Sequence, residues 1–90
     1  MTQRIVCAAN RFVDQNGWSY IVLGARHYDK LMLEAIRNIP PGTYEKEQGF
    51  IDQHGNFLTR EEAYVIAVAA DQIIRRVGGD EGRLFSENLY

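Results

Sequence analysis

The sequence predicts one α+β domain in which two helices pack on one face of a mostly antiparallel sheet made of two β-hairpins. Three observations lead to this class. The length of 90 residues suits a single domain, turn residues separate short β-branched runs, and two segments have the apolar spacing of helices. The predicted element order is β-β-α-β-β-α, and residues 1–90 form one domain.

The first hairpin is predicted from residues 4–23. Residues 4–13 are rich in β-branched and small apolar types, which favours a strand. Residues 14–17 then carry turn chemistry, including an Asn-Gly pair that readily adopts positive φ. Residues 18–23 resume the strand pattern and end at Gly24, which completes the hairpin.

A short helix and a second hairpin follow. Asp29 precedes apolar residues at helical spacing, which predicts a helix over about 29–38. Pro40 and Pro41 end it, because proline cannot continue the hydrogen-bond ladder. The polar residues 43–48 predict a loop, and residues 49–52 and 56–58 flank a turn-like segment, as in a short hairpin.

The second helix is predicted over residues 60–77. Thr59 stands three residues before Glu62, which is the spacing of a capping box. Gly78-Gly79 is expected to close the helix through a left-handed cap. The apolar residues in the last segment, residues 80–90, indicate that it packs onto the domain. One apolar stripe runs along the helix: Ala63, Ile66, Ala67, Ala70, Ile73, Ile74 and Val77.

Apolar residues on a second face of the same helix predict that the protein self-associates. Tyr64, Val65 and Val68 lie off the apolar stripe and need a second covering surface. A domain of this size also buries a small core, so association stabilises it. We therefore expect a homodimer or an assembly of dimers.

Composition excludes several partners and compartments. Ten basic against twelve acidic residues give a net charge of −2, which argues against duplex nucleic acid as the main partner. No apolar run is long enough to span a bilayer. A single cysteine, Cys7, and the absence of a signal-peptide pattern predict a cytoplasmic protein with no membrane partner.

No catalytic, metal-binding or cofactor-binding pattern stands out. His27 and His54 each have an aspartate two residues away, but the spacing matches no zinc signature and lacks the Ser or Thr of two-histidine phosphoesterases. Cys7 lies in an apolar strand and is interpreted as a core residue rather than a nucleophile. We expect a protein that is not an enzyme and that needs neither a metal nor a cofactor.

A binding function fits the remaining residues better. Eight of the ten basic residues are arginine, whose planar fork grips phosphate and stacks on flat rings. Candidate ligand residues are Arg26, Phe50, Thr59 and Arg60, with Arg75 or Arg76 at the end of the second predicted helix. Each has a structural alternative: Phe50 suits a core, and Arg75 or Arg76 suits the C-terminal helix dipole.

Five stretches together resemble a family of small phage proteins, the first-described Thoeris anti-defence sponges. They are RIVCAA at residues 4–9, GARHY at 24–28, QGFIDQ at 48–53, LTREEA at 58–63 and LFSENLY at 84–90. The resemblance implies a dimer that binds a cyclic ADP-ribose isomer made by TIR-domain defence enzymes and does not degrade it. Some members are similar in binding cyclic oligonucleotides as well.

The resemblance also implies where the ligand lies. The base is stacked between an aromatic residue and an arginine, and the best-matching positions are Phe50 and Arg76. Arg26, Thr59 and Arg60 are the next candidates. The expected function is sequestration of a cyclic nucleotide immune signal in the host cytoplasm. The alternative is an interaction protein that blocks a host protein through its apolar helix face.

Overall fold

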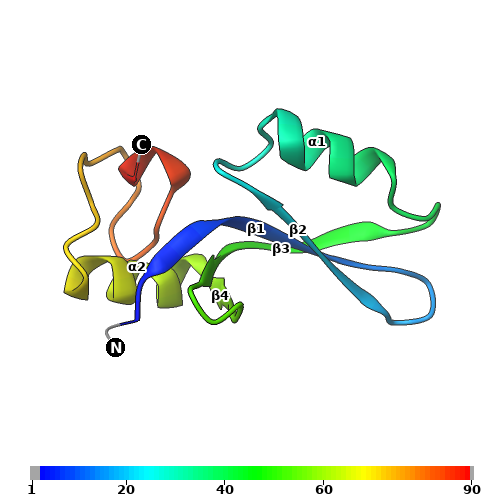
Figure 1. Cartoon of the computed structure of the whole chain (residues 1–90), viewed down its shortest axis with the longest axis horizontal. Coiled ribbons are helices and arrows are strands. Elements are labelled where there is room, and N and C mark those ends of the chain that lie inside the picture. The colour runs from blue at the N-terminus through cyan, green and yellow to red at the C-terminus, as the bar shows by residue number, and fades with distance from the viewer. Residues whose placement is uncertain (1–2, 90) are drawn as a thin grey trace.

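The computed structural model describes residues 3–89 and confirms the α+β class and the element order. One antiparallel sheet has the strand order β2-β1-β3-β4, and helices α1 and α2 lie at different ends of it (Figure 1). Within residues 3–89 no helix is long and apolar enough to cross a bilayer. The elements are β1 (Ile5–Val13), β2 (Ser19–Gly24), α1 (Lys30–Arg37), β3 (Tyr44–Asp52), β4 (Phe57–Thr59), α2 (Arg60–Ala69) and the 3-10 turn η1 (Ser86–Asn88).

The first predicted hairpin is confirmed. β1 pairs with β2 across a turn in which Asp14 accepts a hydrogen bond from Gly17 N at 3.1 Å and donates its own backbone N–H to Trp18 O at 3.0 Å. Gly17 has φ +85°, so this is a type I turn followed by a glycine bulge. Glycine suits this position because it has no Cβ and adopts positive φ without strain. β1 also pairs with β3 and is therefore a central strand.

Both helices contribute to one hydrophobic core. The α1 N-cap is Asp29, whose carboxylate accepts from Met32 N at 2.9 Å, and Met32 is fully buried. Helix α2 contributes Ala63 and Ala67. The capping box of Thr59 with Glu62 is confirmed. The buried core residues are Ile5, Ala8, Phe12, Val22, Met32, Phe50, Leu58, Ala63, Ala67 and Leu84.

The loop predicted over residues 43–48 is wrong, because β3 begins at Tyr44. The polar side chains that suggested a loop make cross-strand contacts with β1 instead. Asn10 Nδ2 donates to Glu45 Oε1 at 2.8 Å, and Arg11 forms an ion pair with Glu47 at 3.2 Å. Pairs of this kind stabilise a sheet, so a charged strand can pair with β1, here with a register shift between Arg11 and Phe12.

The second helix is also shorter than predicted, since it ends at Ala69 and not at residue 77. Asp71 has φ +55°, its N–H bonds to Val68 O at 3.1 Å, and Gln72 N bonds to Ala67 O at 2.9 Å. These two bonds define a Schellman motif in which aspartate takes the usual glycine position. Gly78-Gly79 is therefore not a helix cap.

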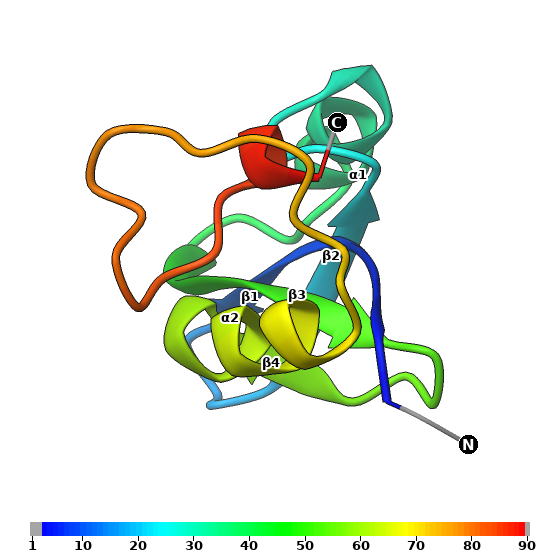
Figure 2. The ribbon, with the colours of Figure 1, turned by 90° about the vertical axis from the view of Figure 1, so that its left-hand side faces the viewer.

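Beyond α2 the chain takes its hydrogen-bond partners from distant segments. The Gln72 side chain bonds to both the N–H and the carbonyl of Ile5, at 2.8 and 2.9 Å. The irregular stretch then loops away and returns over α2 (Figure 2). The expected packing of the last segment is confirmed for Leu84, Ser86 and Asn88, which are buried, whereas Tyr90 lies outside the described residues.

A steric test of the β3–β4 pair follows from Gly49. A Cβ at this position would overlap the Leu58 carbonyl oxygen and lie 2.8 Å from Phe57 Cζ. Gly49→Ala should therefore lower the free energy of unfolding by about 1–3 kcal/mol, as overpacking does. Gly78→Ala is the matched control, because a Cβ at Gly78 meets nothing within 4 Å. Urea denaturation compares the two variants, and equal stability would contradict the register of this strand pair.

Candidate functional site

Arg60, the first residue of α2, joins three parts of the chain. Its guanidinium donates to the Leu84 carbonyl oxygen at 2.8 Å and to Gln48 Oε1 at 2.7 Å. The same group lies over the ring of Phe85, with Cζ 4.8 Å from the ring centroid. Burial lowers the pKa of Arg60, but a guanidinium still carries its charge at neutral pH. Arg60 is thus a charged group fixed against an aromatic face.

Arg83 brings a second guanidinium to the same ring. Its Cζ lies 5.9 Å from the Phe85 centroid, and one of its nitrogens donates to Gly79 O at 3.2 Å. Arg83 is exposed and Phe85 is partly exposed. We call Arg60, Arg83 and Phe85 the Phe85 cluster. It combines a flat ring with two cations, and these are the groups that stack on a base and pair with phosphate.

A chain of hydrogen bonds leads from the Phe85 cluster across the sheet. Gln48 Nε2 donates to Tyr28 Oη and to Glu45 Oε2, each at 3.1 Å, and the Tyr28 hydroxyl donates to Glu45 Oε1. Burial, and then the neighbouring Glu45, raises the pKa of Tyr28 to about 12, so the phenol stays protonated. Asn10 also donates to Glu45, while its buried Oδ1 has no partner among the described residues.

His27 is locked between β3 and the last segment of the chain. Its Nε2 lies 2.8 Å from Gly49 O, which can only accept, and its Nδ1 lies 2.6 Å from Ser86 Oγ. The ring therefore carries its proton on Nε2 and accepts at Nδ1 from the hydroxyl. Burial, and then the charge of Arg60, lowers the pKa of His27 to about 4. Both ring nitrogens are thus engaged in structural hydrogen bonds.

Phe50, expected to stack on a base, lies in the core. It is fully buried, pairs with Leu58 across β3 and β4, and meets the His27 ring edge-on at 4.9 Å between centroids. A ring without exposed surface cannot receive a base, so this arrangement favours the core interpretation. The aromatic ring that is partly exposed and lies beside an arginine is Phe85 instead.

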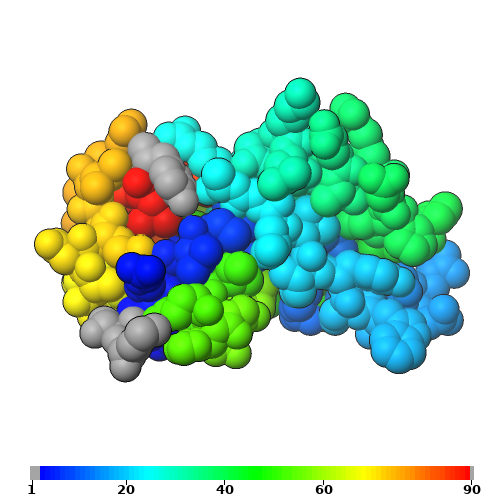
Figure 3. Space-filling view, viewed as in Figure 1, coloured from blue at the N-terminus to red at the C-terminus, as the bar shows by residue number. Residues whose placement is uncertain are grey.

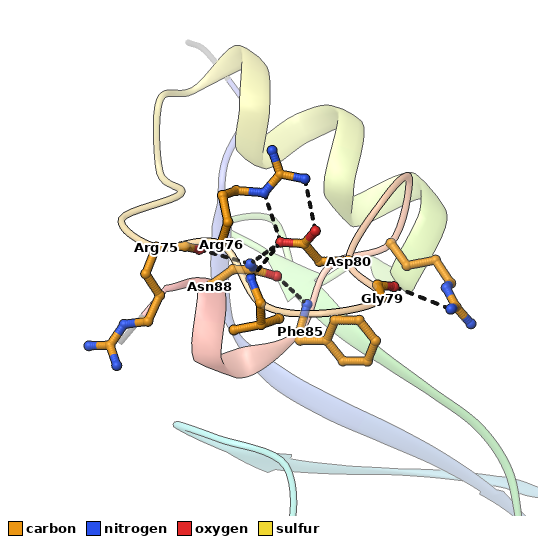
Figure 4. A network of polar contacts seen from close by, with 8 residues as sticks. Arg75, Arg76, Gly79, Asp80, Phe85 and Asn88 are labelled. Carbon is orange, nitrogen blue, oxygen red and sulfur yellow. Dashed lines mark hydrogen bonds and ion pairs between the residues drawn. The ribbon is translucent and has the colours of Figure 1, made fainter.

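Arg76 is held by Asp80 outside the core. Its Nε and Nη2 each lie 2.8 Å from a carboxylate oxygen of Asp80, whereas the Arg75 side chain points away from that carboxylate (Figure 4). The hydrogen bonds from Arg76, together with those from Val77 N and Asn88, lower the pKa of Asp80. Asp80 is buried, so Arg76 neutralises an internal charge.

Thr59 and Arg26 occupy different settings. The Thr59 hydroxyl accepts from Glu62 N at 3.1 Å, and Thr59 N donates to Glu62 Oε1 at 2.9 Å. The acidic side chain therefore already uses these helix-terminal groups, and less is left for an anion. Arg26 is exposed in the loop between β2 and α1, where its backbone N–H donates to Asp29 Oδ2 at 3.2 Å.

Sequence reasoning missed Gln48, Arg83 and Phe85. Their proximity arises only because residues 83–85 return to the start of α2, where Leu84 N bonds to Arg60 O at 2.9 Å. The apolar character of this segment indicated packing but not its place. Within residues 3–89 no group of three or more His, Cys, Asp and Glu residues is placed to hold a metal. Cys7 is half-buried, and burial raises the pKa of its thiol.

The burial of His27 and the hydrogen bonds of its ring predict a pH dependence of stability. The pKa of His27 is about 4 in the folded chain and about 6.5 in an unfolded one. Between these two pKa values the unfolded state therefore binds more protons than the folded state. The stability that neutral His27 contributes to the folded state is fully present above pH 6.5 and is lost as the pH falls towards 4. Urea unfolding should show a loss of about 1–3 kcal/mol over this range. His54→Gln should keep this loss, because His54 lies in an exposed turn; an unchanged loss in His27→Gln would contradict the assignment.

The Arg76–Asp80 pair predicts an order of thermal stability. Asp80→Ala should lower the melting temperature most, because Arg76, Asn88 and Val77 N all lose their acceptor. Arg76→Ala should have a smaller effect, since Asp80 keeps two of its donors. Arg75→Ala is the control and should leave the melting temperature unchanged, because its side chain points away from the carboxylate. Differential scanning calorimetry measures the order, and a larger effect of Arg75→Ala would contradict it.

Comparisons with known proteins place the chain in a family. Searches of curated proteins and of solved structures found no match. The family model described as the phage T4 y16D protein matches residues 4–90. The match covers nearly the whole chain and includes α2 and the Phe85 cluster. The chain therefore belongs to the phage T4 y16D protein family.

Proposed function

We propose that this phage protein binds a small nucleotide signal in the host cytoplasm and withholds it without degrading it. The ligand is of the cyclic ADP-ribose type, and cyclic oligonucleotides share its chemistry. The observation that carries the proposal is the Phe85 cluster, in which Arg60 is fixed 4.8 Å from an aromatic centroid and Arg83 lies 5.9 Å from it. An aromatic face next to guanidinium groups suits a base that is joined to phosphate.

The roles within the cluster differ. Arg60 is held by Leu84 and Gln48, so it is pre-organised and loses little side-chain entropy when a ligand stacks nearby. Arg83 is exposed and makes one backbone contact, which leaves its charge available for a phosphate. In this proposal the aromatic platform is Phe85 and not the buried Phe50.

The state of the titratable groups supports binding without catalysis. His27 has both ring nitrogens occupied and a pKa lowered to about 4, so it is a poor general base at neutral pH. The raised pKa of Cys7 likewise disfavours its thiolate. A ligand bound at the Phe85 cluster is therefore expected to leave the protein unchanged.

A second candidate function rests on the exposed face of α2. Val65 is 67% and Val68 is 53% exposed, although α2 packs Ala63 and Ala67 into the core. An apolar helix face of this kind can cover a groove on a host protein. Recovery of one host protein in stoichiometric amount, lost in Val68→Asp, would favour this function over nucleotide binding.

Heat release tests the proposed function directly. Purified protein incubated with a cyclic ADP-ribose isomer is separated from free ligand and denatured, and the released molecule is identified by mass spectrometry. We expect the intact nucleotide. A chemically altered product would identify an enzyme, and the absence of bound nucleotide would contradict the proposal.

Calorimetric titration then locates the site. Phe85→Ala should weaken binding by about 1–3 kcal/mol if the ring stacks on a base. Arg83→Ala should weaken it by about 1.5–3 kcal/mol if the guanidinium pairs with phosphate. Arg37→Ala, at the exposed end of α1, is the matched arginine control and should bind as the wild type does. Phe50→Ala should instead destabilise the fold by about 3–5 kcal/mol, as truncation of a core ring does.

A further inference from the structure

Strand β2 is an open edge of the sheet. The strand order β2-β1-β3-β4 leaves one side of β2 unpaired within residues 3–89. Natural sheets protect such edges with short strands, prolines or charged side chains. The opposite edge follows this rule, because β4 has only three residues. β2 has six residues, Ser19–Gly24, and none of them is charged or proline.

The free backbone groups on this edge can be assigned. Asp14 N bonds to Trp18 O, so Trp18 faces β1 with its backbone groups. Facing alternates along an antiparallel strand. Tyr20, Val22 and Gly24 therefore bond towards β1, while Ser19, Ile21 and Leu23 present their N–H and C=O groups outwards. This row of donors and acceptors is the pattern with which another β-strand pairs.

Apolar side chains border the row. Ile21 and Leu23 are 43% and 40% exposed, and Trp18, just before the strand, is 70% exposed. β2 and its turn lie at the surface in the right half of the space-filling view, next to α1 (Figure 3). Leu31 and Leu33 of α1 are also exposed, and they lie on opposite flanks of the helix because they are two residues apart. A partner strand would thus meet the apolar side chains of Ile21 and Leu23 at this edge.

We propose that this edge binds a second copy of the chain, with β2 pairing antiparallel to β2 of the partner subunit. A two-fold axis at Ile21 sets Ile21 opposite itself and Ser19 opposite Leu23. All three outward-facing residues are then paired at once, which gives about six hydrogen bonds. The strand is self-complementary in this register, and the result is a continuous eight-stranded sheet.

Charge does not oppose this register. Asp14 bonds to Trp18 on the β1 side of β2 and so lies away from the open edge, and none of the six residues of β2 is charged. The paired strands therefore bring no like charges together. This interface differs from the α2 face expected from Tyr64, Val65 and Val68.

Analytical ultracentrifugation of two variants separates the two interfaces. Ile21→Pro removes an outward N–H and leaves the bonds to β1 in place, since proline is tolerated on the open side of an edge strand. It should raise the dimer dissociation constant by at least about tenfold, the effect of losing roughly 1.4 kcal/mol. Val68→Asp, on α2, should sediment as the wild type does. A monomeric wild type, or dissociation by Val68→Asp and not by Ile21→Pro, would overturn the proposal.

Cross-linking keeps the test decisive if Ile21→Pro fails to fold. Residues opposite each other in a hydrogen-bonded antiparallel pair have Cα atoms about 5.5 Å apart, which lies within the range of a disulfide. In a Cys7→Ser background, Ile21→Cys should form a covalent dimer on mild oxidation, and Val65→Cys should not. Cross-linking of Val65→Cys alone would show that the copies meet through α2 instead.

Discussion

The buried side chain of Asn88 holds the irregular last part of the chain in place. Its Nδ2 donates to Arg75 O and to Asp80 Oδ2, each at 2.9 Å, and its Oδ1 accepts from Phe85 N at 2.8 Å. Its backbone oxygen accepts from Ile74 N at 2.8 Å. One amide thus satisfies backbone groups that a helix or sheet would otherwise pair. The position of Phe85, and with it the candidate site, depends on this residue.

The same dependence explains which parts of the fold could be predicted. The hairpin of β1 and β2, the helix α1 and the capping box at Thr59 are local features, and their signals lie within a few residues of each other. Helix α2 ends early because Asp71 takes a left-handed conformation that usually belongs to glycine, and because Gln72 bonds to Ile5, which is 67 residues away. No local sequence pattern indicates the contact between Gln72 and Ile5. The strand at residues 44–48 could not be predicted for a related reason. Its charged residues bond to residues of β1 that are distant in the sequence, and no local pattern indicates this pairing.

The candidate site was predictable only in part. Sequence reasoning selected Arg60, which lies at the centre of the Phe85 cluster, but it chose Phe50 as the ring. Each phenylalanine has one large apolar neighbour, Ile51 or Leu84, and only the fold shows which ring is buried. Phe50 lies on a central strand opposite Leu58 and is buried, whereas Phe85 lies on the returning segment and is partly exposed. Arg76 was selected because the family resemblance matched it to an arginine that stacks on the base, whereas the structure pairs its guanidinium with Asp80.

The arginines near the Phe85 cluster have a structural role that also bears on binding. Arg60 holds the returning segment through Leu84 O, and Arg76 holds it through Asp80, which also accepts from Asn88. A cation that already has protein partners is oriented before a ligand arrives, so less side-chain entropy is lost on binding. Its net attraction for an anion is weaker for the same reason, because part of its charge is satisfied. Arg83 makes a single backbone hydrogen bond, so less of its charge is satisfied by protein groups. In the proposed function, Arg60 would therefore position the ring and Arg83 would supply most of the attraction for a phosphate.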